Sequence, residues 1–216
     1  MTIPPVFSVD FFNNSILGLS KMNRTGQYAR IRITIYRNEG GLYAPDTNSV
    51  SWLIECNPLT GNPLSLNKKG LNLGIYEEIF KPINKLSNLK TANGLIFVMA
   101  GIFKKENALD EAVLLNDSLN IVEAISSNIF IVKNRILYTP ALSQGCVAGV
   151  MRAEIIKKVM AEKINCFEAV VSREDLLNAD EVFLTNAIRG IQWVSKIQET
   201  NYSNRFTKWI KELVYR

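Results

Sequence analysis

Two residues of this sequence could carry out bond-forming and proton-transfer chemistry in a buried setting. Lys90 lies in the segment S-N-L-K-T-A-N (87–93), just before a run of apolar residues. An exposed lysine has a pKa of about 10.4, and partly apolar surroundings lower it, so that the neutral amine can attack a carbonyl carbon. Glu123 stands between Val122 and Ala124, where a carboxylate could hold a hydrogen-bonded partner in its protonated form. The alternatives are a solvated lysine at a helix end and an exposed strand carboxylate.

A third feature could bind an anion. The sequence Gly149-Val150-Met151 opens a predicted amphipathic helix over residues 149–164. Backbone N–H groups and the helix dipole favour a phosphate at such an end, and glycine lets the backbone approach closely. A plain helix start is the alternative interpretation.

The composition restricts the chemistry further. The 216 residues contain 25 Lys and Arg, 20 Asp and Glu and no histidine, for a net charge of +5. Without histidine the chain can form no Ser-His-Asp triad, no Cys-His pair and no histidine metal site. Proton transfer near neutral pH must therefore use Lys, Tyr, Cys or a carboxylate with a shifted pKa.

Cysteine usage and charge distribution favour a cytoplasmic protein. The three cysteines form no C-x-x-C pair, and we expect buried free thiols in a reducing compartment. Basic residues are scattered, which argues against nucleic acid as a partner. The N-terminus lacks the basic segment of a signal peptide, and the longest apolar stretch, near 94–103, is too short to span a bilayer. We expect neither a membrane partner nor a metal.

The elements that must position these residues follow from hydrophobic periodicity. We predict helices over 10–22 (capped by Asp10), 89–105, 149–164 and 206–214. Strands are predicted over 28–36, with Ile31, Ile33 and Ile35 on one half-buried face, and over 50–56, 167–172 and 181–185. Residues 111–138 are predicted to form an antiparallel meander, and residues 57–70, with two Pro and two Gly, to form an interdomain linker.

Several motifs keep their mutual spacing and resemble a known family. E-A-I-S-S-N-I-F from Glu123, L-Y-T-P (137–140) and V-A-G-V-M-R (147–152) are similar to the signature of the class IV, or fold-type IV, aminotransferases, which use pyridoxal 5'-phosphate. S-N-L-K-T-A-N is similar to the family's lysine segment, and A-D-E-V-F-L-T-N-A (179–187) to its second phosphate segment. The resemblance covers about residues 30–194. It implies an α+β, two-domain fold: a partial N-terminal α/β domain (1–60) and a C-terminal pseudo-barrel that binds the cofactor (61–216).

The resemblance also implies a role for each site residue. Lys90 would form the Schiff base with pyridoxal phosphate and carry the substrate's α-proton, while Glu123 would hold the ring nitrogen protonated. Val147 would pack against one ring face, although a simple core position is the alternative. The phosphate would be held by two segments: Gly149, Val150 and Met151, and Asn186 with Ala187. Arg37, in I-Y-R-N-E-G-G-L-Y, matches a family loop that binds substrate carboxylate, and a surface-loop arginine is the alternative.

Within this family, three positions favour a lyase. Asn93 follows Lys90 by three residues, a spacing that lyases and D-amino acid transaminases share. Leu95 stands where branched-chain enzymes carry Tyr, and Met151 stands where they usually carry Thr. The expected reaction converts 4-amino-4-deoxychorismate to 4-aminobenzoate and pyruvate, for folate synthesis. The alternatives are a branched-chain or D-amino acid aminotransferase and a catalytically inactive homologue.

The start of the sequence departs from the family pattern. Nothing before Asp10 resembles the family's H-x-x-R-L segment, so we expect the chain to enter the pattern partway through a truncated N-terminal domain. A sheet without its first strands exposes an edge, which predicts reduced stability or a partner that covers the gap. The family forms homodimers with the site near the subunit interface, and we therefore expect a homodimer.

Overall fold

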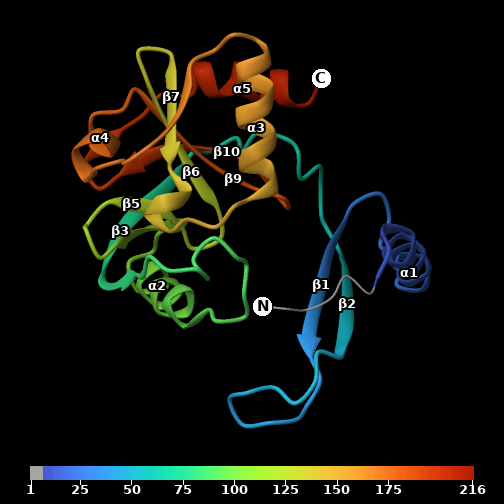
Figure 1. Ribbon diagram of the computed structural model, residues 1–216. Helices are drawn as coiled ribbons and strands as arrows, with labels where there is room; N and C mark the ends of the chain where they lie inside the picture. Colours follow the sequence, from blue (N-terminus) through green and yellow to red (C-terminus); the bar gives the residue numbers. More distant parts are fainter. Residues whose placement is uncertain (1–6) are drawn as a thin grey trace. The chain divides into compact units, whose positions relative to one another are not determined.

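The computed structural model describes residues 7–216. The chain forms two compact units, Met1–Pro63 and Leu64–Arg216 (Figure 1). The boundary between the units falls inside the Pro- and Gly-rich segment 57–70, where few side chains can form a core.

The smaller unit contains one helix and one strand pair. Helix α1 (Val9–Met22) precedes strands β1 (Ala29–Arg37) and β2 (Val50–Pro58), which pair antiparallel. Phe11 of α1 packs edge-on against Trp52 of β2, with ring centroids 5.2 Å apart. The predicted cap was wrong: Ser8 caps α1, its Oγ accepting a hydrogen bond from the Phe11 N–H at 3.1 Å, while Asp10 lies inside the first turn.

The apolar face predicted for β1 is only partly covered. Ile33 pairs with Ile54 and Ile35 with Trp52 across the two strands. Ile33 and Ile35 nevertheless remain 41% and 44% exposed, because one helix and two strands of this unit provide too little surface to bury them. The expectation of a half-buried strand therefore holds for Ile31 and fails for these two residues.

The larger unit is built on a nine-stranded mixed sheet. Its strands are β3 (Leu71–Lys81), β4 (Glu111–Asn116), β5 (Ile121–Ala124), β6 (Asn128–Lys133), β7 (Ile136–Pro140), β8 (Cys166–Ala169), β9 (Glu181–Asn186), β10 (Gly190–Ile197) and β11 (Thr200–Asn201). The order is β5-β4-β3-β10-β9-β6-β7-β8, with β11 paired to β10. Strand β3 runs parallel to both of its neighbours. Sequence analysis assigned no strand to β3 or β10.

The predicted meander over 111–138 was wrong in its pairing. Strands β4 and β5 form one antiparallel pair and β6 and β7 form another, but β6 lies against β9, some fifty residues later in the chain. Local turns fix the two hairpins, whereas burial of the apolar faces of β6 and β9 decides where each hairpin joins the sheet.

Helices cover the outer faces of the curled sheet. Helix α2 (Leu95–Glu106) packs on β3 and β4 around Tyr76, Ala100 and Leu114. Helices α3 (Val150–Ala161) and α5 (Arg205–Val214) lie side by side over β6 and β9, where Phe130 and Phe183 stack with centroids 4.9 Å apart (Figure 1). The opposite face of the same strands encloses the largest apolar cluster, which includes Leu73, Val113, Ile129, Leu184 and Val194. This arrangement confirms the predicted α+β pseudo-barrel.

A strand carboxylate caps the last helix. Glu181, 3% exposed at the start of β9, accepts hydrogen bonds from the backbone N–H groups of Phe206 and Thr207, both at 2.8 Å. The hydroxyls of Thr207 and Ser203 donate to the same carboxylate at 2.8 and 3.1 Å. Four donors compensate the burial of this charge and fix α5 on the sheet.

Candidate functional site

Glu123 is the most enclosed of the predicted site residues. It lies in β5 with 3% of its surface exposed. Its Oε1 accepts a hydrogen bond from the ammonium group of Lys81, and its Oε2 accepts one from the backbone N–H of Val147 at 2.9 Å. A carboxylate has about four lone-pair positions, so capacity remains for one further donor.

Lys81 is a residue that sequence analysis missed. It ends β3, is 6% exposed, and donates both to Glu123 and to the carbonyl of Ser87, the latter at 3.2 Å. Its Nζ lies 5.6 Å from the centroid of the Phe97 ring. The signal in the sequence was a single lysine closing the apolar stretch G-I-Y-E-E-I-F-K; its partner, 42 positions later, is brought close only by the β3–β4–β5 pairing.

The start of α3 lies beside this carboxylate. Gly149 occupies the N-cap position and offers no side chain to the N–H groups of the first turn, to which Val150 and Met151 belong. Those N–H groups have no carbonyl partner within a helix and are available to an anion. A Cβ at Gly149 would stand 2.0 Å from Asn128 Oδ1, so this close approach needs glycine. Asn128 also donates to the Val147 carbonyl at 2.8 Å.

One buried hydroxyl near this helix has no partner. Thr185, in β9, is 1% exposed, and its Oγ1 makes no hydrogen bond within the protein. Thr185 pairs with Asn128 on the adjacent strand. Thr185 follows Phe183 by two positions in the strand, and the Phe183 side chain packs in the cluster under α3. Side chains two positions apart in a strand share a face, so Thr185 faces the same side of the sheet. A buried polar atom without a partner costs about 1–3 kcal/mol, and a bound group could supply the missing hydrogen bond.

The turn after β9 is held by the side chain of Asn186. Its Oδ1 accepts from the N–H groups of Ile188 and Arg189 at 2.9 and 2.8 Å. Its Nδ2 donates to Ser127 Oγ at 2.9 Å, on the loop that follows β5. Ala187 is exposed in this turn. The second predicted phosphate segment is therefore tied to the strand that carries Glu123.

Lys90 lies in a loop rather than in a helix. Helix α2 begins at Leu95, so the prediction of a helix from residue 89, with the lysine at its N-terminus, was wrong. Asn93 and Gly94 interrupt the apolar run, and Gly94 has a non-helical conformation. The side chain of Lys90 is exposed. The loop itself is anchored by Asn88, which bonds to the segment that precedes α3.

Arg37 belongs to the other unit of the chain. It ends β1, and its Nη1 donates to the Thr47 carbonyl at 2.9 Å and to Asn48 Oδ1. These contacts hold the loop between β1 and β2 closed at its base.

Cys146, next to Val147, does not supply a nucleophile at neutral pH. Burial raises the pKa of its thiol to about 11, although the charge of Arg152 acts in the opposite direction. Its Sγ donates to the Pro140 carbonyl at 3.4 Å. Cys56 and Cys166 are also free thiols, and burial raises the pKa of Cys166 to about 11.

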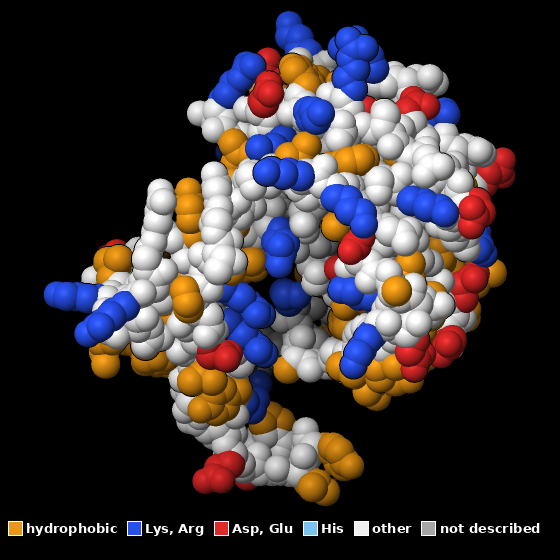
Figure 2. Space-filling view, turned by 180° about the vertical axis from the view of Figure 1, so that it is seen from behind, with side chains coloured by type: hydrophobic (Ala, Val, Ile, Leu, Met, Phe, Trp, Pro, Cys, Tyr) orange, Lys and Arg blue, Asp and Glu red, His pale blue; other side chains and the backbone are white. Residues whose placement is uncertain are grey.

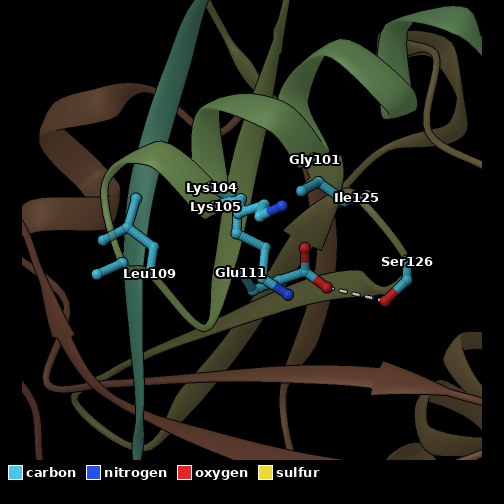
Figure 3. A pocket seen from close by; sticks show the side chains of 8 residues that line it. Gly101, Lys104, Lys105, Leu109, Glu111, Ile125 and Ser126 are labelled. Atoms are coloured by element: carbon cyan, nitrogen blue, oxygen red, sulfur yellow. Dashed lines mark hydrogen bonds between the residues drawn. The ribbon is translucent and has the colours of Figure 1, made fainter.

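An open pocket of about 670 Å³ lies between the C-terminal part of α2, the start of β4 and the loop that follows β5 (Figure 3). Lys104, Lys105 and Glu111 line it, and Ser126 donates to Glu111 Oε2 at 2.8 Å. Neither Lys90 nor Glu123 lines this pocket. On one face of the larger unit, Lys and Arg side chains are mixed with Asp and Glu, with no continuous basic stripe (Figure 2).

No helix within the described residues 7–216 is both long and apolar enough to cross a bilayer. No three His, Cys, Asp or Glu side chains in this range are grouped as metal ligands.

Comparisons with known proteins agree on one family. The model of the amino-transferase class IV family matches residues 1–197. A "Putative branched-chain-amino-acid aminotransferase" of Methanocaldococcus jannaschii is 32% identical over 189 residues, which are 85% of this chain and 65% of that protein. The aminodeoxychorismate lyase of Bacillus subtilis is 27% identical over 195 residues, 89% of this chain and 64% of that one. The chain thus spans just under two thirds of the length of each relative.

Solved structures show the same fold at low sequence identity. A "Putative 4-amino-4-deoxychorismate lyase" from Legionella pneumophila superposes with a TM-score of 0.87 at 22% identity, covering 99% of this chain and 78% of that one. An aminotransferase from Brucella abortus, solved with pyridoxal phosphate, gives 0.81 at 19% identity, covering 99% and 76%.

Proposed function

Because this chain belongs to the class IV aminotransferase family, whose enzymes depend on pyridoxal phosphate, we propose that it binds this cofactor and cleaves 4-amino-4-deoxychorismate to 4-aminobenzoate and pyruvate. The observation that carries the proposal is the buried Glu123 carboxylate beside the start of α3. Its Oε2 accepts from Val147 N–H, two residues before the glycine N-cap. This pairing of a buried carboxylate with an uncapped helix start supports a ring-nitrogen partner and a phosphate site side by side.

The residues present fit the cofactor in three respects. Glu123 has capacity for one more donor, as a protonated ring nitrogen requires. The first-turn N–H groups of Val150 and Met151 suit a phosphate, since Gly149 leaves them uncapped. The unpartnered Thr185 hydroxyl lies on the α3 side of β9, directly before the turn at Asn186 and Ala187.

The bound cofactor supplies an electron sink for the bonds at the substrate α-carbon. The chain's own residues then have separate tasks. Lys90 Nζ would hold the cofactor covalently until the substrate amine takes its place, and would then take up the α-proton and return a proton as pyruvate leaves. Glu123 keeps the ring nitrogen protonated, and Val147 packs against the ring. Arg37 binds a substrate carboxylate, because a guanidinium group can donate two parallel hydrogen bonds to the two carboxylate oxygens.

Lyase chemistry is favoured over branched-chain amino transfer by Leu95 and Met151, which resemble the lyase pattern in the lysine and phosphate segments. The spacing of Asn93 from Lys90 is shared by lyases and D-amino acid transaminases. Amino transfer from a branched-chain or D-amino acid is the second candidate, favoured by the 32% identity to the M. jannaschii relative. An inactive homologue is the third, because the side chain of Lys90 is exposed.

The chain's unpaired thiols support a cytoplasmic location, where cysteines stay reduced. We further propose a homodimer, as in the family at large; sedimentation equilibrium would detect it.

A titration of the purified protein with pyridoxal phosphate tests the cofactor assignment. We expect visible absorbance from a lysine-bound cofactor, and borohydride reduction followed by peptide mass mapping should place the adduct on Lys90. Lys90→Ala should abolish the band, while Lys85→Ala, an exposed lysine of the same loop, should leave it unchanged. Failure of the wild type to form any adduct would contradict both enzyme proposals.

The product then separates lyase from transaminase. Release of pyruvate from aminodeoxychorismate without an added 2-oxo acid supports the lyase. Amino transfer to 2-oxo acids with no pyruvate release supports the second candidate instead.

A further inference from the structure

We propose that Asn88 is a positioning residue, which fixes the loop carrying Lys90 against the segment 142–148 and so sets the reach of the lysine amine toward a cofactor held at the start of α3. This inference rests on the proposed function. It concerns a residue of the S-N-L-K-T-A-N segment to which sequence analysis gave no role, two positions before Lys90.

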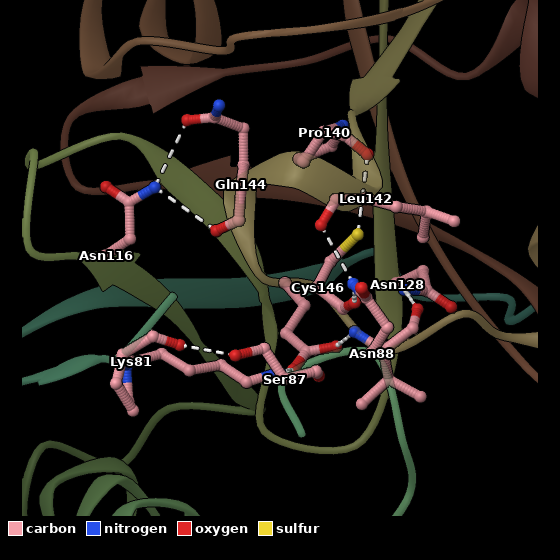
Figure 4. A network of polar contacts seen from close by, with 12 residues as sticks. Lys81, Ser87, Asn88, Asn116, Asn128, Pro140, Leu142, Gln144 and Cys146 are labelled. Atoms are coloured by element: carbon pink, nitrogen blue, oxygen red, sulfur yellow. Dashed lines mark hydrogen bonds and ion pairs between the residues drawn. The ribbon is translucent and has the colours of Figure 1, made fainter. Parts of the chain in front are cut away.

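Asn88 makes three hydrogen bonds to the segment that leads into α3 (Figure 4). Its Nδ2 donates to the Leu142 carbonyl at 2.8 Å and to the Cys146 carbonyl at 2.7 Å. Its own carbonyl accepts from the Ala148 N–H at 3.0 Å. One residue therefore uses both hydrogens of its amide and its backbone to hold two loops together.

The segment 142–148 is itself held in place on its other sides. Asn116 Nδ2 donates to both the carbonyl and the Oε1 of Gln144, each at 3.2 Å. Asn128 donates to the Val147 carbonyl at 2.8 Å, and Cys146 Sγ to the Pro140 carbonyl at 3.4 Å. Because this segment is fixed to β4 and β6, Asn88 ties the lysine loop to a rigid part of the sheet.

These hydrogen bonds form a closed circuit that includes Glu123, the proposed partner of the cofactor's ring nitrogen. Lys81 donates to Glu123 and to the Ser87 carbonyl, and Ser87 is the neighbour of Asn88. Glu123 accepts from Val147 N–H, within the segment that Asn88 grips. The Ser87 hydroxyl adds a bond to the Pro82 carbonyl at 2.7 Å. This circuit of hydrogen bonds thus joins the loop of Lys90, the carboxylate of Glu123 and the segment 142–148 that leads into α3.

This geometry matters because one cofactor must reach three points at once. Its phosphate would lie at α3, its ring nitrogen at Glu123 and its carbonyl carbon at Lys90. The first two points are fixed by buried elements, whereas Lys90 is exposed and on a loop. A displacement of about 1 Å in a reacting group can cost on the order of a hundredfold, so the anchor of that loop should control the covalent step.

Two ligands separate positioning from general support of the site. Pyridoxal 5'-phosphate can bond to Lys90, whereas pyridoxamine 5'-phosphate carries the same ring and phosphate but no carbonyl. We expect Asn88→Ala to weaken pyridoxal phosphate binding by about tenfold or more and to slow adduct formation on Lys90. Its affinity for pyridoxamine phosphate should change by less than about threefold, because Glu123 and α3 remain in place.

The control is Asn84→Ala in the same loop. Asn84 Oδ1 accepts only from the nearby Leu86 N–H at 2.8 Å, and this variant should bind both ligands like the wild type. Asn88→Asp keeps the side-chain shape but removes both N–H donors, and it should reproduce the selective loss. It also serves if Asn88→Ala does not fold, and hydrogen exchange of residues 85–92 in the cofactor-free protein should be faster in either variant, because the lysine loop has lost its anchor.

Equal losses for the two ligands would overturn the inference, since they indicate damage to the whole site. So would unchanged binding of pyridoxal phosphate in a folded Asn88→Asp protein. A wild type that binds neither ligand would instead refute the proposed function.

Discussion

The Lys81–Glu123 pair offers a quantitative test of how the candidate site is held together. Lys81→Met removes one charge of a pair in which both side chains are almost fully buried. Glu123 would keep only the Val147 N–H as a donor. Breaking a buried ion pair by removing one partner costs about 3–5 kcal/mol. Since domains are stable by about 5–15 kcal/mol, the loss should consume a large fraction of the stability.

The double variant shows whether the cost comes from the charge left behind. Lys81→Met combined with Glu123→Gln leaves no buried charge at this point. The glutamine carbonyl can still accept from Val147 N–H. We therefore expect the double variant to be more stable than Lys81→Met alone, although each substitution by itself is destabilising. The difference between the double variant and the sum of the single ones measures the coupling.

Urea unfolding of the cofactor-free protein, followed by circular dichroism, measures these losses. The free energy of unfolding should fall with urea concentration at the same slope in all variants, so that a shift of the midpoint reports a change in stability. Lys196→Met is the matched control, because its pair with Glu199 lies at the surface with 39% and 97% of the side chains exposed. That control should lose less than about 1 kcal/mol. A Lys81→Met variant that loses no more than the control would refute the reasoning.

Three further substitutions test the neighbouring features. Gly149→Ala should destabilise the protein by about 1–3 kcal/mol, because its Cβ would stand 2.0 Å from Asn128 Oδ1; thermal unfolding checks this, and an unchanged midpoint would contradict it. Thr185→Val should leave the cofactor-free protein as stable or more stable, since the hydroxyl has no partner, yet weaken pyridoxal phosphate binding in a fluorescence titration. The Asn134 backbone N–H, with Lys133, lowers the pKa of Asp180 below 3.8. The stabilisation from Asp180 is therefore present above pH 3.8 and lost as the pH falls through the lowered pKa. The free energies of unfolding of the wild type and of Asp180→Asn should converge as the pH falls. A difference between them that does not change with pH would show that the Asp180 charge is not the source of the stabilisation.

The parts of the site that sequence predicted are those set by local patterns. The glycine before α3 has a local meaning, since it begins an amphipathic helix, and the apolar neighbours of Glu123 indicated a buried strand. The family motifs around both residues kept their spacing. The family, the fold and the cofactor class followed from these stretches, because each motif lies within one turn or strand.

The parts that sequence missed depend on pairing between distant residues. Lys81 acquires its role only when β3, β4 and β5 bring it to Glu123. The position of β6 is set by β9 rather than by its neighbours along the chain. The predicted helix over 89–105 includes the lysine loop, because the helical spacing of Leu95, Val98 and Met99 does not reveal where the helix begins. In the structure, Asn88 of that loop bonds to a segment more than fifty residues away. Periodicity cannot report such contacts.

The cap on α5 has a consequence for the order in which the chain can fold. Glu181 enters the sheet with β9, but its four donors come from residues 203–207, more than twenty positions later. During synthesis from the N-terminus, a sheet that has formed through β9 would hold a desolvated carboxylate without partners. We therefore expect the nascent sheet to stay incompletely assembled until the α5 segment has left the ribosome, so that completion of the sheet waits for translation of that segment.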